Sequence, residues 1–321
     1  MSRIIITDFA PVVIPTLNRY EHFKRCLDSL ERCTWADHTD VYVGLDYPPS
    51  AKYVDGWKKI DAYLAEKEKK NGFKNLIVRR RDHNLGIGHP GGNEYLVQQE
   101  VASVTDKYIF SEDDNEFSPN FLEYMNKALD KYKDDDRVIR ISAYTPPVFY
   151  NLTDENTFFG VDTPAYGIGS WQHKNADVHI VDYKEINTAL RSSFWRTWNL
   201  FWTYPALIYM AVHMVRAKKN YGDIRYSMNN LLCGTFTLEP TQSLSRNWGG
   251  DGTGLHSGVV KGLEKEEIQT ELHFELQDIP FEYPEKLRKR LRFRNMPKSN
   301  TKYYIFLIYK FLYVMRFFFF G

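Results

Sequence analysis

Cysteine is scarce in this chain. Its 321 residues include three, Cys26, Cys33 and Cys233, and no two of them form a Cys-x-x-Cys pair. This pattern argues against a disulfide framework and against a zinc site built from paired thiolates. We therefore predict three reduced structural thiols, which suit a reducing compartment. No secretory signal is visible at the N-terminus, so we expect a cytoplasmic protein.

Acidic residues are absent from Lys286 to Gly321, a stretch that holds ten Lys and Arg. Since the whole chain has a net charge of +1, residues 1–285 carry 32 basic against 41 acidic residues. A uniformly basic nucleic-acid-binding protein would differ from this acidic body with a basic end. We predict no nucleic-acid partner, and a tail at 286–321 that docks on an anionic membrane surface.

Long hydrophobic runs without charge are also missing. Residues 302–321 include sixteen apolar or aromatic side chains, but Lys310 and Arg316 lie among them. Two interior charges argue against a spanning helix and favour a helix that lies in the membrane interface with its basic side chains toward the headgroups. A helix that packs on the rest of the protein is the alternative.

The first half of the chain alternates short apolar runs with amphipathic stretches. Strands are predicted at 11–15, 41–46, 76–78, 107–111 and 138–142. Helices are predicted at 20–33, 51–70 and 94–102, and from an N-cap at Ser118 onward. This alternation predicts an α/β fold with a doubly wound, mostly parallel sheet and helices on both faces. Such sheets bind ligands at the carboxyl ends of their strands.

Three adjacent acids, Glu112, Asp113 and Asp114, follow the fourth predicted strand. Carboxylates gathered at a strand end suit a hard divalent cation, which also binds diphosphate oxygens. Residues 134–136 form a second acidic triplet, but they follow a polar helix end, so we interpret them as a solvated connection. The sequence thus predicts a Mn²⁺ or Mg²⁺ site of the DXD type at 112–114.

Two segments carry a family resemblance. Pro-Val-Val-Ile-Pro-Thr-Leu-Asn-Arg at 11–19 and Tyr-Ile-Phe-Ser-Glu-Asp-Asp-Asn-Glu-Phe-Ser-Pro-Asn-Phe-Leu at 108–122 resemble inverting glycosyltransferases of the A-type fold. Within that class, the chain resembles the animal Golgi N-acetylglucosaminyltransferases that begin complex N-glycans or extend O-mannose, as a bacterial-type relative. The likeness covers about 10–145 and returns at 166–171, 222–225 and 245–258.

The resemblance implies how a UDP-sugar donor is held. Asp114 would be the direct metal ligand, Asp113 would contact ribose or sugar, and Glu112 would support the site. Asp46 would accept the uracil N–H. Residues of the first turn and of the glycine-rich loop at 83–93 would also lie against the donor: Pro15, Thr16, Asn18, Arg19, Asn84, Gly86 and Asn93.

Inverting transfer requires a base for the acceptor hydroxyl. The resemblance favours Asp223, although Gly222 and Ile224 depart from the family pattern, and Asp251 is the runner-up. Residues 245–258 would form a flexible loop that closes over the donor, with Arg246 or His256 meeting the diphosphate. Trp171 would pack against sugar or acceptor, or be an ordinary core residue.

We therefore expect a metal-dependent inverting glycosyltransferase that moves a sugar, such as N-acetylglucosamine, from a UDP-sugar to a cell-surface glycan or lipid-linked precursor in polysaccharide biosynthesis. Residues 1–285 would form the catalytic domain, with a nucleotide-sugar half at about 1–145 and an acceptor half at about 146–285. The tail would hold it on the inner face of the cell membrane. The alternatives are an inactive membrane-tethered nucleotide-sugar-binding protein and a nucleotidyltransferase.

Overall fold

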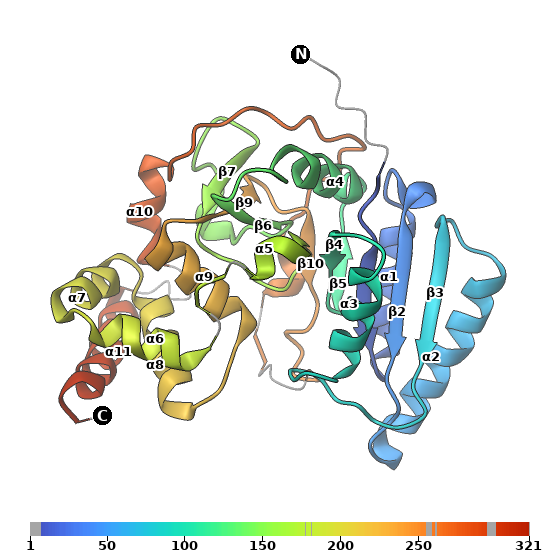
Figure 1. The fold of residues 1–321 in the computed structure, drawn as a ribbon, viewed down its shortest axis with the longest axis horizontal. Coiled ribbons are helices and arrows are strands. Elements are labelled where there is room, and N and C mark those ends of the chain that lie inside the picture. The colour runs from blue at the N-terminus through green and yellow to red at the C-terminus, as the bar shows by residue number, and fades with distance from the viewer. Residues whose placement is uncertain are drawn as a thin grey trace.

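The computed structural model describes residues 8–176, 178–180, 182–254, 259–260, 262–293 and 300–320. An eight-stranded sheet in the order β3-β2-β1-β4-β8-β6-β9-β7 runs through both halves of the chain (Figure 1). The sheet therefore joins the two predicted halves, and no boundary near residue 145 divides it.

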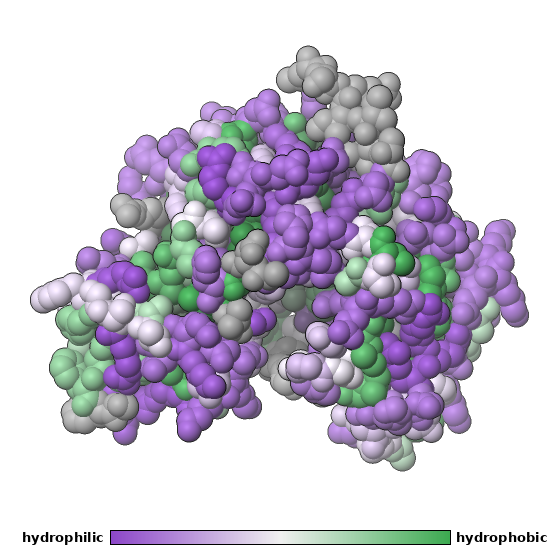
Figure 2. Space-filling view, viewed as in Figure 1, coloured by the Kyte–Doolittle hydropathy of each residue, from purple (hydrophilic) through white to green (hydrophobic). Residues whose placement is uncertain are grey.

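The first half has the predicted alternation. Strands β1, β2, β3 and β4 are parallel neighbours. Its elements are β1 (Val12–Thr16), α1 (Tyr20–Glu31), η1 (Ala36–His38), β2 (Asp40–Leu45), α2 (Ala51–Lys69), β3 (Asn75–Arg80), α3 (Asn93–Ala102) and β4 (Lys107–Phe110). In Figure 1 the arrows of β2 and β3 point to the lower edge of the molecule, which Figure 2 shows hollowed near its centre.

The second half adds two antiparallel strands. Strand β8 runs antiparallel to β4 and β6, and β7 runs antiparallel to β9, whereas β6 and β9 are parallel. The remaining strands of the chain are β5 (Asn115–Phe117), β6 (Val138–Ser142), β7 (Thr157–Gly160), β8 (Ile168–Trp171), β9 (Phe236–Pro240) and β10 (Ser245–Asn247). The predicted α/β class with a mostly parallel sheet is confirmed.

The remaining helices are α4 (Phe121–Lys131), η2 (Pro147–Phe149), α5 (Gln172–Ala176), α6 (Tyr183–Arg191), α7 (Phe194–Thr203), α8 (Pro205–Ala217), α9 (Gly222–Cys233), η3 (Leu263–Lys265), α10 (Glu285–Leu291) and α11 (Asn300–Phe320). Helices α6 to α11 gather on the side of the molecule away from β3 and α2 (Figure 1).

Alternating side chains of the strands bury the two faces of the sheet. Val12 and Ile14 of β1 belong to the core shared with α1, α2 and α4. Val13 points the other way and packs with Val97 of α3. This alternation of period two puts helices on both faces. Trp171 is 1% exposed in the first core, so it is an ordinary core residue and cannot contact a sugar.

A second core holds the helices of the C-terminal half. Helix α8 is its centre and contacts α6, α7, α9 and α11. Residues 194–215 thus form two packed helices. None of the helices in the described parts of the chain combines the length and hydropathy needed to span a bilayer.

The C-terminal tail is partly packed on this core, since Val314 and Phe317 of α11 are buried. Lys310 is buried as well, with Nζ 4.9 Å from the centre of the Tyr209 ring. The expectation that Lys310 faces headgroups is therefore wrong, because aromatic rings cover it. Arg316 is exposed.

Candidate functional site

The acidic triplet lies where two parallel strands end. Strand β4 ends at Phe110 beside Val13 of β1, so the turn after β1 and the triplet share one edge of the sheet. Thr16 Oγ1 donates a hydrogen bond of 2.8 Å to Asp113 Oδ2. The two segments meet because the carboxyl ends of neighbouring parallel strands lie together.

Arg19 supplies positive charge to both aspartates. Its Nη1 lies 2.8 Å from Oδ2 of Asp114, and its Nη2 pairs with Asp113. Both aspartates are 6% exposed. Burial raises the pKa of Asp113, and the charge of Arg19 opposes that shift. An arginine thus compensates acids that would otherwise be costly to bury.

Strand β10 closes the other side of the triplet. It pairs antiparallel with β5. Asn247 Nδ2 donates to Asp114 Oδ1 at 2.7 Å, and the Trp248 N–H donates to the Asp114 carbonyl at 2.8 Å. A Cβ on Gly249 would lie 2.2 Å from Asp114 Oδ2, so the backbone passes the carboxylate closely.

The sequence did not single out Asn247, Trp248 and Gly249 as site residues, although they belong to the stretch at 245–258 that was expected to lie over the donor. The same stretch was expected to be a flexible loop throughout. That expectation is wrong for residues 245–247, which are held as a strand beside the acids.

The surroundings of Glu112 favour its protonated form. Burial, followed by the negative charges of Asp114 and Asp113, raises its pKa to about 8, while Arg19 opposes the shift. The charge of Asp223 adds to the rise, so that carboxylate also acts electrostatically on the triplet.

Asp223 and Asp251 lie at different borders of this site. Asp223 is exposed in the first turn of α9, and Thr163 Oγ1 donates to its carbonyl at 3.1 Å. Asp251 Oδ2 lies 3.2 Å from His22 Nε2. Burial raises the pKa of Asp251, but hydrogen bonds from Thr253 and the charges of His22 and Arg19 leave it below its usual range.

The predicted donor loop is organised around Asp46. Its carboxylate accepts hydrogen bonds of 2.9 Å from the backbone N–H groups of Leu85 and Gly86, and one of 3.0 Å from Asn84 Nδ2. Asn93 Nδ2 donates to the Gly44 carbonyl at 2.7 Å. These contacts fix the loop at the end of β2. A role for Asp46 in holding uracil stays a prediction.

The remaining predicted residues take several positions. Pro15 pairs with Gly44 in the sheet, and the Asn18 carbonyl packs so closely on α2 that a Cβ on Gly56 would lie 2.0 Å away. Arg246 donates from Nη2 to Glu116 Oε2 at 2.7 Å, so its guanidinium is engaged next to the triplet. His256 lies outside the described residues.

A cation at this site would depend on few protein ligands. Within the described parts of the chain, no three His, Cys, Asp or Glu side chains are grouped to hold a metal ion. Asp113 and Asp114 are the carboxylates that could bind one. Mg²⁺ is commonly held by one or two carboxylates together with substrate phosphates.

No family model and no curated protein matches the chain. Among solved structures, it is similar to residues 1–349 of TarS from S. aureus, at 15% identity over 54% of this chain and 50% of that one, with a TM-score of 0.38. The same TarS segment in complex with UDP gives equal values. The WbbM bifunctional glycosyltransferase matches at 12% identity over 72% of this chain, with a TM-score of 0.35.

This chain thus spans half or less of the length of these matched chains: 50% for the TarS segment and 38% for WbbM. TM-scores below 0.5 do not define a shared fold.

Proposed function

We propose that the protein is a metal-dependent inverting glycosyltransferase that moves a sugar from a UDP-sugar to a glycan or lipid-linked acceptor. The observation that supports it most is the pair of nearly buried carboxylates, Asp113 and Asp114, at the joined ends of β1 and β4. N-acetylglucosamine as the sugar, and kinship with the Golgi N-acetylglucosaminyltransferases, rest on the sequence motifs.

The residues present fit a divalent cation, Mn²⁺ or Mg²⁺. Asp113 and Asp114 offer oxygen ligands, and a positive group, the Arg19 guanidinium, already lies against both. Such a cation would neutralise the charge that develops on the leaving diphosphate. Arg19 would then turn from the acids to the diphosphate, since its planar fork suits phosphate oxygens.

Asp223 would take the proton of the acceptor hydroxyl as its oxygen attacks the anomeric carbon and the bond to the diphosphate breaks. Asp223 is exposed, so an acceptor can reach it. Its negative charge contributes to the raised pKa of Glu112. Asp251, paired with His22, is the second candidate for this role.

We propose that the acceptor is a cell-surface glycan or a lipid-linked precursor of polysaccharide biosynthesis. Transfer would take place at the cytoplasmic face of the membrane. The aromatic and basic composition of the C-terminal tail supports this location.

A thermal-shift panel of nucleoside diphosphates and UDP-sugars, with and without Mn²⁺, tests the donor site. Specific ligands raise the melting temperature by mass action. We expect a Mn²⁺-dependent rise with UDP compounds that Asp114→Ala abolishes. A rise of equal size in Asp114→Ala, or no rise with any nucleotide, would refute the assignment.

A further inference from the structure

Helix α11 is covered on one side only. Its buried side includes Val314 and Phe317, which pack among α7 and α8. A second stripe faces solvent, with apolar residues separated by three, four and seven positions: Ile305, Ile308, Leu312 and Phe319. Such spacing puts these residues along one side of a helix. An apolar face of this length is unusual on a free protein surface.

Helix α7 extends this exposed surface. Trp195 is 71% exposed, and Trp202 is also exposed. The ring of Phe194 lies 5.3 Å from that of Trp195 and 6.4 Å from that of Phe319, which makes the surface continuous between the two helices. We name it the α7–α11 face, consisting of Trp195, Trp202, Ile305, Ile308, Leu312 and Phe319. Figure 2 shows green and pale residues gathered at the lower left, where Figure 1 draws α7 and α11.

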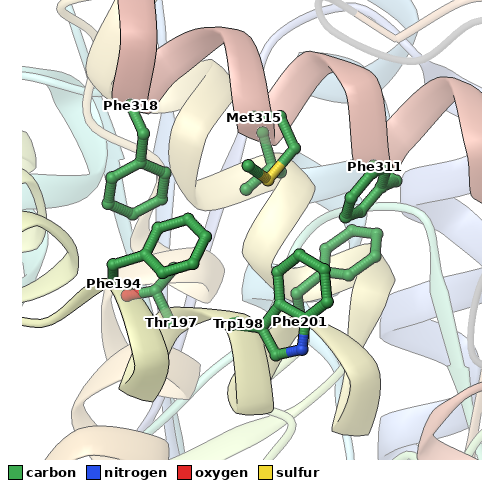
Figure 3. Close-up of a pocket in the computed structure, with 8 residues that line it drawn as sticks. Phe194, Thr197, Trp198, Phe201, Phe311, Met315 and Phe318 are labelled. Atoms are coloured by element: carbon green, nitrogen blue, oxygen red, sulfur yellow. The ribbon is translucent and has the colours of Figure 1, made fainter.

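The seam beneath this face is already filled. Rings of α7 and α11 point toward one another across it, as Figure 3 shows for Trp198, Phe201 and Phe311. The cavity left between them measures about 10 Å³, close to the minimum for one water molecule. A lipid tail or sugar therefore has no room between the helices, and any partner must cover the face from outside.

Basic side chains predominate around the face. Helices α7, α8 and α11 contain no Asp or Glu, and Arg196, Lys302 and Arg316 are exposed on them. Helix α10 adds the exposed Lys289, whose Nζ lies 4.0 Å from the exposed Glu285 of the same helix, and Arg292 follows it. Two copies of the chain meeting through this face would bring like charges together. An anionic lipid surface instead offers an apolar acyl-chain region for the apolar side chains and negative headgroups for the basic ones.

We propose that the α7–α11 face docks on an anionic lipid bilayer, with α11 lying in the interface and not crossing it. Exposed Trp and Tyr side chains such as Trp195, Tyr304 and Tyr309 suit the headgroup level. Unlike the sequence-based expectation of a tail alone, the surface includes α7 and excludes Lys310. This docking does not depend on the proposed sugar transfer.

Vesicle flotation of the full chain tests the proposal. One set of vesicles consists of phosphatidylcholine alone, and the other of phosphatidylcholine and phosphatidylglycerol in equal amounts. The variant Trp195→Glu/Ile308→Glu alters only exposed positions of the face. The matched control Val104→Glu/Leu272→Glu makes an equal charge change at exposed apolar positions elsewhere. Melting temperatures and sedimentation velocity on all three proteins monitor folding and self-association.

We expect wild type and control to float with the vesicles that contain phosphatidylglycerol. The affinity of the face variant for these vesicles should be lower by roughly tenfold or more. High salt and Arg196→Gln/Arg316→Gln should weaken the wild-type binding. Equal binding of wild type and face variant, or absence of binding by wild type, would overturn the proposal. So would a wild-type dimer that the face variant alone dissociates, because the occupant would then be a second copy.

Discussion

Arg19 lies against both Asp113 and Asp114, with its Nη1 2.8 Å from Asp114 Oδ2 and its Nη2 paired with Asp113. Two adjacent carboxylates that are 6% exposed need a positive neighbour, because burying unpaired charge is costly. Arginine and a divalent cation can each meet that need. Because Arg19 and a cation would compete for the same two carboxylates, a change at Arg19 should alter the effect of Mn²⁺ on stability, and no substrate is needed to measure it.

The first prediction concerns Arg19→Ala. Removing the guanidinium leaves two nearly buried acids uncompensated, so the free energy of unfolding should fall by about 3 kcal/mol. Added Mn²⁺ should raise the melting temperature of this variant more than that of wild type. Thermal unfolding with and without Mn²⁺ measures both effects.

Arg80→Ala is the matched control, since Arg80 pairs with Asp61 and Glu68 at the surface. Its loss should cost about 1 kcal/mol or less and should not change the response to Mn²⁺. An equal Mn²⁺ response in Arg19→Ala and wild type would contradict a cation site at the two aspartates.

Gly249→Ala should disturb the acids from the side of β10. Its new methyl group would lie 2.2 Å from Asp114 Oδ2, so either the backbone or the carboxylate must move. We expect a loss of about 1–3 kcal/mol in unfolding free energy, together with weaker UDP binding by calorimetry.

Gly222→Ala, at the start of α9, is the control, because a Cβ there meets nothing within 4 Å. It should be as stable as wild type or slightly more stable. Wild-type stability and UDP affinity in Gly249→Ala would show that the close approach to Asp114 is unimportant.

Comparing Asp223→Asn with Asp251→Asn identifies the base. Loss of a general base lowers kcat by about 10² to 10⁴, whereas donor affinity should stay near its wild-type value. We expect the large fall in Asp223→Asn and a smaller one in Asp251→Asn, measured as steady-state sugar transfer. A large fall confined to Asp251→Asn would move the role to the carboxylate beside His22.

The buried ammonium group of Lys310 should make the stability of the protein depend on pH. Burial lowers the pKa of its ammonium group to about 8 in the folded protein, whereas the ordinary value is 10.5. The folded state therefore binds fewer protons than the unfolded state between these values, and Lys310 makes stability rise with pH across that window. Below pH 8 the burial cost is fully present.

Lys310→Met should consequently stabilise the protein at pH 7, by about 1–3 kcal/mol, and by less at pH 9.5. Urea unfolding at the two pH values measures this difference. Lys302→Met, at an exposed position of the same helix, should show no such trend. A gain for Lys310→Met that is equal at both pH values would contradict the assignment to the buried ammonium group.

Local patterns predicted the first half of the fold well. Short apolar runs located β1, β2, β3 and β4, and helical spacing located α1 and α2, because the burial of these elements shows in the pattern of consecutive residues. The sequence placed the acidic triplet at the carboxyl end of a strand, but it did not show that this strand is the neighbour of β1. That parallel pairing brings Thr16 and Asp113 together.

The misses involve contacts between distant segments. Ser118 was expected to cap a helix, but α4 begins at Phe121 with Asn120 as its N-cap residue. The Ser118 N–H instead donates to the Leu244 carbonyl at 2.9 Å. Asn247 contacts Asp114 because β10 pairs with β5. No pattern of neighbouring residues in the sequence predicts this pairing of distant segments. Lys310 is covered by Tyr209 of another helix for the same reason.

Release of UDP from a panel of UDP-sugars, compared between wild type and Asp114→Asn, tests the central claim most directly. We predict Mn²⁺-dependent release from at least one UDP-sugar by wild type, and a loss of at least about 10² in rate in the variant. UDP binding without any release by wild type would indicate a nucleotide-sugar-binding protein. Equal release by both proteins would contradict a donor site at Asp114.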